Sequence, residues 1–247
     1  MKHYVENKVI IITGGSSGFG FATAQLLLEL GAKVVITGRN EARLKEAVSK
    51  LGGGANLLAV QADAVKTADW TKLIETVLGK FGKIDVLVNN HGAGIKIAPT
   101  EEMSDDDIQD ILDANLHSVI KGCREVVKVM KKQKSGRIIN VSSGCAYRGW
   151  AAWGIYTAAK AGMVGFTRCL HREMAEWGGI ATNFIPGAAK TDFCNAANID
   201  SSWQDGYPEA EDFARMIVNS IDLPDNTMVE EVRIWGTRQV HDTFNPY

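Results

Sequence analysis

The chain has 247 residues and an ordinary globular composition, with 45% apolar and 23% charged residues. That length suits one α/β domain, and a net charge of −2 gives no indication of a nucleic-acid or membrane partner. The longest apolar runs are strand-length, far below the roughly 20 residues that a membrane span requires. The N-terminal sequence carries no signal-peptide pattern, so we expect a cytoplasmic protein.

Short apolar runs alternate with longer helical patterns along the chain. The predicted strands cover residues 8–13, 33–37, 56–61, 84–88, 136–141, 181–185 and 228–235. The predicted helices begin near Gly18, Glu41, Thr67, Ser104, Trp153 and Pro208. Strands such as KVIII and IDVLV are almost continuously apolar, which indicates burial on both faces. We therefore predict an α/β fold with a single doubly wound parallel sheet of seven strands flanked by helices.

One stretch, residues 188–207, follows neither pattern, and a loop of that length inside a compact domain is usually functional. We expect residues 1–247 to form one domain with a lid near residues 188–207. The cysteines form no C-x-x-C pair, so we expect buried, reduced thiols with no metal site and no disulfide framework. They are Cys123, Cys145, Cys169 and Cys194.

A glycine-rich turn, TGGSSGFG at residues 13–20, joins the first predicted strand to the first predicted helix. Glycine lets the backbone turn tightly and approach a phosphate, while the helix N-terminus supplies free N–H groups and the positive end of a dipole. The G-x-x-x-G-x-G spacing differs from the commoner G-x-G-x-x-G of dinucleotide sites. We predict a nucleotide cofactor here, against Gly14, Ser16, Ser17, Gly18, Phe19 and Gly20.

The second and third predicted strands end in residues that suit the adenosine part of that nucleotide. NAD-preferring enzymes usually place an acid at the end of the second strand, but this chain has Gly38 followed by Arg39. Because an arginine binds a 2′-phosphate through charge-assisted hydrogen bonds, we infer NADP(H); a solvated surface arginine is the alternative. Asp63 ends the third strand and suits the adenine amino group, although a helix-capping or loop carboxylate is nearly as well supported.

Tyr156 and Lys160 lie four residues apart in WGIYTAAKAGMVGF, a stretch with the composition of a helix. Residues i and i+4 share a helix face, so the ammonium can act on the phenol. A free phenol has a pKa of about 10, too high for proton transfer near neutrality, and a nearby cation lowers it. We expect Tyr156 to act as an acid or base; a snorkelling lysine beside a packed tyrosine is the alternative.

Ser143 strengthens the catalytic interpretation. It lies thirteen residues before Tyr156, at the carboxyl end of the fifth predicted strand. Open α/β sheets bind ligands at that edge. Residues at the carboxyl ends of five strands would therefore meet in one crevice: Gly14, Arg39, Asp63, Asn90 and Ser143.

Together these motifs resemble the short-chain dehydrogenase/reductase family, over about four-fifths of the chain. The matching segments are TGGSSGFG, VNNHG at 88–92, DANLHS with Asn115, NVSSG with Ser143, YTAAK at 156–160 and PGAAKT at 186–191. The resemblance implies a Rossmann-type fold and an NADP(H)-dependent oxidoreductase, similar to carbonyl and 3-oxoacyl reductases. Such an enzyme interconverts a ketone or aldehyde and its alcohol by hydride transfer. The resemblance also implies a homodimer or homotetramer built on the catalytic helix and the stretch 104–132, with a monomer as the alternative.

The resemblance further implies roles for the residues of the reacting centre. Tyr156 would be the general acid/base, and Ser143 would hold the substrate oxygen and steady the tyrosine. Lys160 would lower the tyrosine pKa and bind the nicotinamide ribose, and Asn115 would anchor a water that relays protons to Lys160. Ser142 is the competing serine, but the thirteen-residue spacing favours Ser143.

Four more cofactor contacts follow from the same resemblance. The backbone of Asn90 and Ala64 would line the adenosine side, and Ala189 and Thr191 would approach the nicotinamide carboxamide and the pyrophosphate. The chain also departs from the family pattern. His91 stands where alanine is usual, and we expect it to pack or hydrogen-bond, with titration near neutrality as the alternative. The C-terminal segment lacks the glycine-rich ending of many relatives.

Aromatic residues around the catalytic helix and in the expected lid bear on the substrate. Phe193, Trp203 and Tyr207 lie in the expected lid, and Trp150 and Trp153 flank the catalytic helix. These aromatic residues suit an apolar or cyclic ketone, but a core or subunit-contact role is equally well supported. A 3-oxoacyl thioester is a further family-based candidate. 

Two other classes of protein are less consistent with the sequence. An NADP(H)-binding sensor or regulator without turnover would not need the Tyr156–Lys160 pair together with Ser143 and Asn115. A serine hydrolase would need a G-x-S-x-G elbow, which NVSSG is not.

Overall fold

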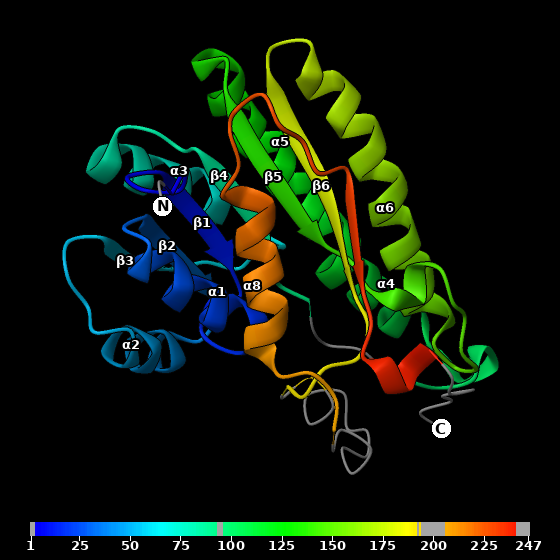
Figure 1. The fold of residues 1–247 in the computed structure, drawn as a ribbon. Helices are drawn as coiled ribbons and strands as arrows, with labels where there is room; N and C mark the ends of the chain where they lie inside the picture. The colour runs from blue at the N-terminus through cyan, green and yellow to red at the C-terminus, as the bar shows by residue number, and fades with distance from the viewer. Residues whose placement is uncertain (1–2, 93–95, 192, 194–205, 241–247) are drawn as a thin grey trace.

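The computed structural model describes residues 3–92, 96–191, 193 and 206–240. Its centre is a parallel sheet of seven strands in the order β3-β2-β1-β4-β5-β6-β7 (Figure 1). The strands are β1 Val9–Thr13, β2 Lys33–Gly38, β3 Leu57–Gln61, β4 Val86–Asn89, β5 Gly136–Val141, β6 Gly179–Pro186 and β7 Glu231–Ile234. The predicted doubly wound sheet is confirmed, with its reversal of strand order between β1 and β4.

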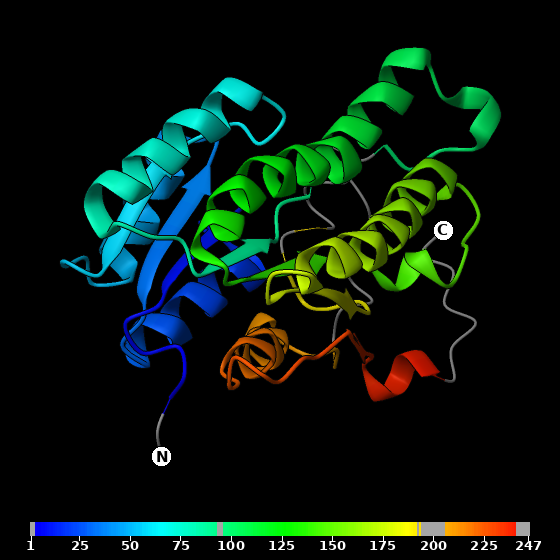
Figure 2. The same cartoon turned by 90° about the horizontal axis from the view of Figure 1, so that it is seen from above.

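Helices cover both faces of the sheet, as the view from above shows (Figure 2). One face carries α1 Gly18–Glu29, α2 Glu41–Lys50 and α8 Ala210–Ile221. The other carries α3 Thr67–Phe81, α5 Ser118–Gln133 and α6 Gly154–Ala175. Shorter elements are α4 Asp105–Leu112, the 3₁₀ turns η1 Thr100–Glu102, η3 Gly144–Ala146 and η5 Thr237–Val240, and the π-turn η2 Asp113–His117.

The two hydrophobic cores follow from the period of two along each strand. In β1, Ile10 and Ile12 pack beneath α1 and α8, whereas Val9 and Ile11 face α3 and α5. All four side chains are fully buried. The continuously apolar strands of the sequence therefore reflect burial on both faces, as predicted.

The π-turn is the main local difference from the predicted elements. The sequence predicts one helical stretch over residues 104–132, but five residues of π-helix interrupt it at Asp113–His117. The wider turn shifts the side chains that follow it, and it places Asn115 fully inside the protein. β7 is also shorter than predicted, because residues 228–230 precede the strand and residue 235 follows it.

A backbone bridge and an ion pair connect the start of the expected lid to the residues that directly follow it. Lys190 pairs with Glu209 as an isolated parallel bridge, and their side chains form an ion pair with an Nζ–Oε1 distance of 3.3 Å. Residues 192 and 194–205, which include Trp203 and Cys194, lie outside the described part of the chain. Tyr207 is described and is buried. Among the described helices, none is long and apolar enough to cross a membrane.

Candidate active site

A pocket of about 440 Å³ opens at the carboxyl edge of the sheet. Most of the predicted site residues line it: Gly14, Ser16, Ser17, Gly18, Phe19, Arg39, Asp63, Ala64, Asn90, Ser143, Tyr156, Lys160, Ala189 and Thr191. The structure thus brings together the predicted residues at the ends of the five strands β1 to β5, with Ala189 and Thr191 after β6. Gly20 and Asn115 lie directly behind the pocket wall instead of on it.

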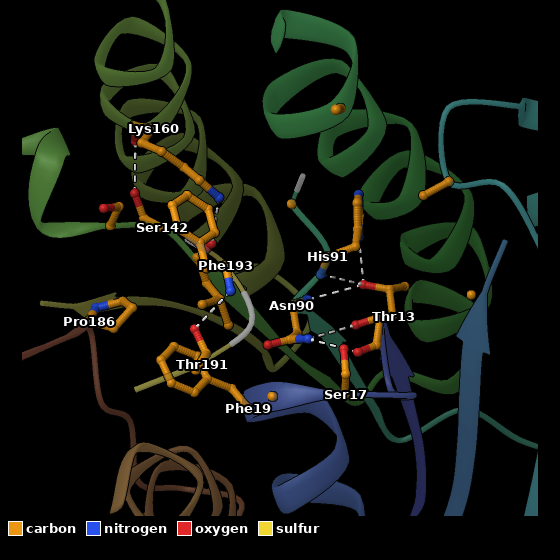
Figure 3. Close-up of a pocket in the computed structure, with 18 of the residues that line it drawn as sticks. Thr13, Ser17, Phe19, Asn90, His91, Ser142, Lys160, Pro186, Thr191 and Phe193 are labelled. Atoms are coloured by element: carbon orange, nitrogen blue, oxygen red, sulfur yellow. Dashed lines mark hydrogen bonds between the residues drawn. The ribbon is translucent and has the colours of Figure 1, made fainter. Parts of the chain in front are cut away.

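The glycine turn after β1 is shaped by contacts that only glycine permits. Gly14 has a φ of +65°, and a Cβ there would lie 3.2 Å from Asn90 Nδ2. A Cβ on Gly20 would lie 2.4 Å from the Gly14 carbonyl oxygen. Asn90 fixes the turn by donating from Nδ2 to the carbonyls of Thr13, at 3.1 Å, and Gly14, at 3.2 Å (Figure 3). Gly15, which the sequence analysis did not single out, is equally constrained, since its Cβ would meet Ile36 at 2.6 Å.

The turn leads into a helix N-terminus that can receive a phosphate. Ser17 is the N-cap of α1 and makes no side-chain cap, so the first N–H groups of the helix are left for another acceptor. Gly18, with a φ of +52°, lies beside Thr191, whose Cγ2 would be 3.9 Å from a Cβ there. Phe19 stacks on Phe213 of α8 with ring centroids 4.9 Å apart, which anchors the start of α1. These features fit the pyrophosphate of a dinucleotide.

Beside β2 and α2 two arginines line the pocket, of which the sequence analysis identified one. Arg39 follows β2, and Arg43 lies on the first turn of α2. Asn40 caps this helix by accepting from the Arg43 backbone N–H at 3.0 Å. The R-x-x-x-R spacing across a helix start was the signal that could have identified Arg43. Two guanidinium groups suit a 2′-phosphate better than one.

Asp63 and Ala64 line the same end after β3. The Asp63 Oδ1 accepts from the Val65 backbone N–H at 3.2 Å, which forms a local turn. Ala64 accepts a 2.9 Å hydrogen bond from the indole of Trp70, which is buried in α3. The loop carboxylate that we kept as an alternative is therefore present, and the same side chain still lines the pocket.

At the other end of the pocket Tyr156 and Lys160 lie on one face of α6, and both are buried. The Lys160 Nζ lies 5.6 Å from the centre of the Tyr156 ring and donates to the Val141 carbonyl at 3.1 Å. Burial lowers the pKa of Lys160 to about 8. Burial also raises the pKa of Tyr156 above its usual value, and the nearby Cys145 acts in the same direction, whereas a hydrogen bond with Ser143 opposes them. The pKa of Tyr156 is therefore raised, which is the opposite of the lowering that we expected from Lys160, and the group that lowers it is Ser143.

The two serines after β5 have different roles. The Ser142 hydroxyl is buried and donates to the Lys160 carbonyl at 2.9 Å, which ties β5 to α6 (Figure 3). The Ser143 hydroxyl accepts from the Cys145 N–H at 3.2 Å and lies in the pocket beside Tyr156. This geometry favours Ser143 over Ser142 as the group that meets a substrate.

Asn115 lies in the π-turn, close to Lys160. A Cβ on Gly92 would lie 2.9 Å from Asn115 Oδ1 and 3.3 Å from Lys160 Nζ. Gly92 therefore lies between the two side chains and close to both. Asn115 Nδ2 donates to the Ile111 carbonyl at 2.9 Å. The predicted neighbourhood of Asn115 and Lys160 is therefore present, and the missing side chain of Gly92 keeps the gap between them open.

His91, beside Gly92, hydrogen-bonds at both ring nitrogens. Its Nδ1 lies 2.6 Å from Thr13 Oγ1, and its Nε2 lies 2.7 Å from Ser118 Oγ. Burial, followed by the charges of Lys160 and Arg39, lowers the pKa of His91 to about 3. The hydrogen-bonding interpretation holds, and the ring does not titrate near neutrality.

An aromatic wall closes the pocket beside Tyr156. Trp153 meets the Tyr156 ring edge-on at 5.7 Å and stacks with Phe193 at 6.4 Å. Trp150 packs edge-on against Trp153 at 6.0 Å. Cys145, a pocket residue that sequence reasoning did not assign, adds an apolar thiol whose pKa is raised to about 12 by burial. Tyr207 does not line this pocket in the described structure.

The remaining cysteines bear on the expectation of buried thiols. Cys123 is buried and free, as expected, but Cys169 is exposed. That part of the prediction is wrong, because Cys169 lies on the outward face of α6 with small neighbours such as Gly165. Within the described ranges no three His, Cys, Asp or Glu side chains gather where they could hold a metal ion.

Comparisons with known proteins agree with this geometry. The family model "short chain dehydrogenase" matches residues 8–202. The 3-oxoacyl-[acyl-carrier-protein] reductase of Synechocystis sp. is 37% identical over 195 residues, 78% of each chain. The corresponding reductase of Vibrio harveyi is 36% identical over 196 residues, 79% of each chain.

Solved structures give the same result. The closed form of serine dehydrogenase complexed with NADP+ has a TM-score of 0.88 at 25% identity, covering 96% of this chain and 98% of its own. A metagenomic short-chain oxidoreductase in complex with NADP has a TM-score of 0.80 at 26% identity, covering 93% and 97%. Both hold the cofactor that the sequence predicts here. The chain therefore belongs to the short-chain dehydrogenase family, as predicted.

Proposed function

We propose that the protein is an NADP(H)-dependent oxidoreductase that interconverts a ketone or aldehyde and the corresponding alcohol. One observation carries this proposal. Tyr156, Lys160 and Ser143 meet at one end of a pocket whose other end holds a glycine turn, a helix N-terminus and two arginines. The family match and the NADP-bound structures support the same reaction class.

The chain's own residues account for the proton transfer. NADPH, when bound, supplies the hydride for the carbonyl carbon. In reduction Tyr156 donates its phenolic proton to the carbonyl oxygen, and the Ser143 hydroxyl holds that oxygen as negative charge develops on it. Tyr156 is protonated at neutral pH, as the group that donates to the carbonyl oxygen must be. Burial raises its pKa and so makes that proton harder to release, and the hydrogen bond with Ser143 opposes this rise.

Lys160 and Asn115 return a proton to Tyr156 after it has donated its own. Lys160 has a pKa lowered to about 8 by burial, so its ammonium can exchange a proton near neutral pH. We assign it to the nicotinamide ribose and to reprotonation of Tyr156. Asn115, across the gap at Gly92, orders the water through which that proton returns.

The remaining cofactor contacts follow the predicted residues. The turn from Gly14 to Gly20 and the α1 N-terminus hold the pyrophosphate, with Thr191 facing Gly18. Arg39, joined by Arg43, holds the 2′-phosphate. The other contacts that we assign are Asp63, Ala64 and Asn90 on the adenosine side and Ala189 near the nicotinamide.

The substrate that fits best is an apolar carbonyl compound. Trp150, Trp153 and Phe193 present aromatic surface beside Tyr156, and Cys145 adds an apolar thiol. We propose an apolar or cyclic ketone, enclosed by a lid near residues 188–207. The reductases named above act on 3-oxoacyl groups, so a 3-oxoacyl thioester is the second candidate.

A substrate panel tests the function directly. NADPH and NADH oxidation are measured with ketones, aldehydes and 3-oxoacyl thioesters, and cofactor binding is measured alongside. We expect turnover with NADPH, fastest with cyclic or aromatic ketones. Tight NADPH binding without turnover on any member would favour the sensor alternative, which nothing in the comparisons supports.

We also propose that the protein forms a homodimer or homotetramer through α5 and α6. We further propose that it is a cytoplasmic protein. One stripe of the outward face of α6 carries the small, exposed residues Ala158, Ala161, Gly165 and Cys169, so a second helix can approach closely along it, with Arg168 exposed beside it. Free thiols at Cys123, Cys145 and Cys169 suit a reducing compartment. Gly165→Glu should reduce the mass measured by light scattering to that of a smaller species. An unchanged mass would move the interface elsewhere.

A further inference from the structure

His91 joins two parts of the site that are distant in sequence. Thr13 ends β1 directly before Gly14, and Ser118 begins α5 three residues after Asn115. The imidazole lies between them, with ring nitrogens 2.6 Å from the Thr13 hydroxyl and 2.7 Å from the Ser118 hydroxyl. In Figure 3 three of the dashed hydrogen bonds converge on the Thr13 hydroxyl, one of them from the His91 ring. A single side chain thus connects the phosphate-binding turn to the π-turn.

The direction of each hydrogen bond follows from its neighbours. Thr13 Oγ1 accepts the backbone N–H groups of Asn90, at 3.1 Å, and His91, at 3.3 Å. Its own proton is therefore donated, and His91 Nδ1 at 2.6 Å is a closer acceptor than the Val88 carbonyl at 3.3 Å. His91 is then neutral, with its proton on Nε2.

The chain of donors continues into the π-turn. His91 Nε2–H donates to Ser118 Oγ, and the Ser118 hydroxyl donates to the Ala114 carbonyl at 3.1 Å. Ala114 lies next to Asn115 and itself lines the pocket. All donors point the same way, from Thr13 to Ala114, so each bond polarises the next. The family pattern usually has alanine at position 91, which could form none of these side-chain bonds.

We propose that His91 is a positioning residue, which holds the phosphate-binding turn and the Asn115 π-turn in a fixed relation. Cofactor affinity and proton transfer then depend on one hydrogen-bonded chain. This inference rests on the proposed function for its catalytic part only, because cofactor affinity can be measured without turnover.

A double-mutant cycle tests the proposal. The variants are His91→Ala, Ser118→Ala, the double variant and His91→Gln, each measured for NADPH Kd, for kcat and for thermal stability. Losing one such hydrogen bond corresponds to about a fivefold effect, so we expect each alanine variant to raise the NADPH Kd and lower kcat by at least that factor. The double variant should be no worse than His91→Ala, because the chain is already broken.

Two controls separate positioning from general destabilisation. Ser220 of α8 is buried and donates to the carbonyl four residues before it at 2.7 Å, as Ser118 does, but lies away from the pocket. Ser220→Ala should lower the melting temperature and leave the NADPH Kd and kcat unchanged. His91→Gln keeps an N–H donor at the end of the side chain and should regain at least half of the loss, on a logarithmic scale.

Three results would overturn the proposal. In the first, the fold-changes in NADPH Kd and kcat caused by His91→Ala and by Ser118→Ala multiply in the double variant. The second is an NADPH Kd in His91→Ala equal to that of the wild type. The third is an equal loss of affinity in Ser220→Ala. A wild-type chain that binds NADPH but reduces no panel member would refute the proposed function, while the cycle on Kd would still decide the role of His91.

Discussion

The two ends of the pocket are built by different physical means. The phosphate end is built from backbone: close-packed glycines, the N-terminus of α1 and the Asn90 amide that holds the turn. The reacting end is built from buried side chains, Tyr156 and Lys160, whose protonation is set by desolvation. Changes at the first end should therefore alter cofactor affinity, and changes at the second should alter the chemical step.

The largest expected effect is at the reacting end. Tyr156→Phe removes the proton donor and keeps the ring that packs against Trp153. We expect turnover to fall about 10³-fold with the NADPH Kd nearly unchanged, as measured by single-turnover kinetics and cofactor fluorescence. Tyr147→Phe is the matched control, because Tyr147 is exposed and outside the pocket, and it should retain activity. Comparable losses in both variants would remove Tyr156 from its assigned role.

The corresponding change at the phosphate end is Gly20→Ala. The new methyl would lie 2.4 Å from the Gly14 carbonyl oxygen and 2.6 Å from Asn90 Nδ2, so the turn must distort. Overpacking of this kind costs about 1–3 kcal/mol, and we expect NADPH affinity to fall by about 10- to 100-fold. Gly79→Ala is the control, since nothing lies within 4 Å of a Cβ there, and it should stabilise α3. Normal NADPH affinity in Gly20→Ala would show that the turn does not shape the cofactor site.

A smaller effect at the same end concerns the choice of cofactor. Arg39→Ala should weaken NADPH by about 10-fold and leave NADH almost unaffected, because only NADPH carries the 2′-phosphate. The double variant with Arg43→Ala should lose more of the preference. Lys45→Ala, on the same helix but paired with Glu41, serves as the control. Equal losses for NADPH and NADH would exclude the 2′-phosphate contact.

The smallest effect is a pH dependence of stability at the reacting end. Burial lowers the pKa of Lys160 from 10.5 to about 8, so the folded chain holds that proton less tightly than the unfolded chain. Below pH 8 the folded protein carries the full free-energy cost of a buried Lys160 ammonium. This cost disappears as the pH rises towards 10.5, the pKa of the lysine in the unfolded chain. In the cofactor-free protein, the melting temperature of Lys160→Met relative to the wild type should be higher at pH 7 than at pH 9.5. A difference that is constant or grows with pH would contradict this assignment.

The sequence predicted the phosphate end of the pocket, which is built from backbone, better than the reacting end, which is built from side chains. Strand order and the glycine turn follow from periodicity and from steric rules that act locally, so Gly14, Gly18 and Gly20 could be placed before the fold was known. The π-turn at Asp113–His117 could not, because its helix-forming residues read as continuous helix and tertiary packing selects the wider turn. The raised pKa of Tyr156 also depends on burial, which a spacing of four residues does not report. Likewise, the two partners of His91 lie 78 and 27 residues away in the chain.

Isotope transfer is the most direct test of the central claim, that Tyr156 protonates a carbonyl while NADPH reduces it. NADPH deuterated at the transferring position is incubated with the best substrate of the panel, and the alcohol is analysed by mass spectrometry. We predict one deuterium on the carbinol carbon for each NADPH oxidised by the wild-type enzyme, and about 10³-fold slower labelling by Tyr156→Phe. The account would be contradicted if NADPH were oxidised without label reaching the alcohol, or if Tyr156→Phe transferred the label at the wild-type rate.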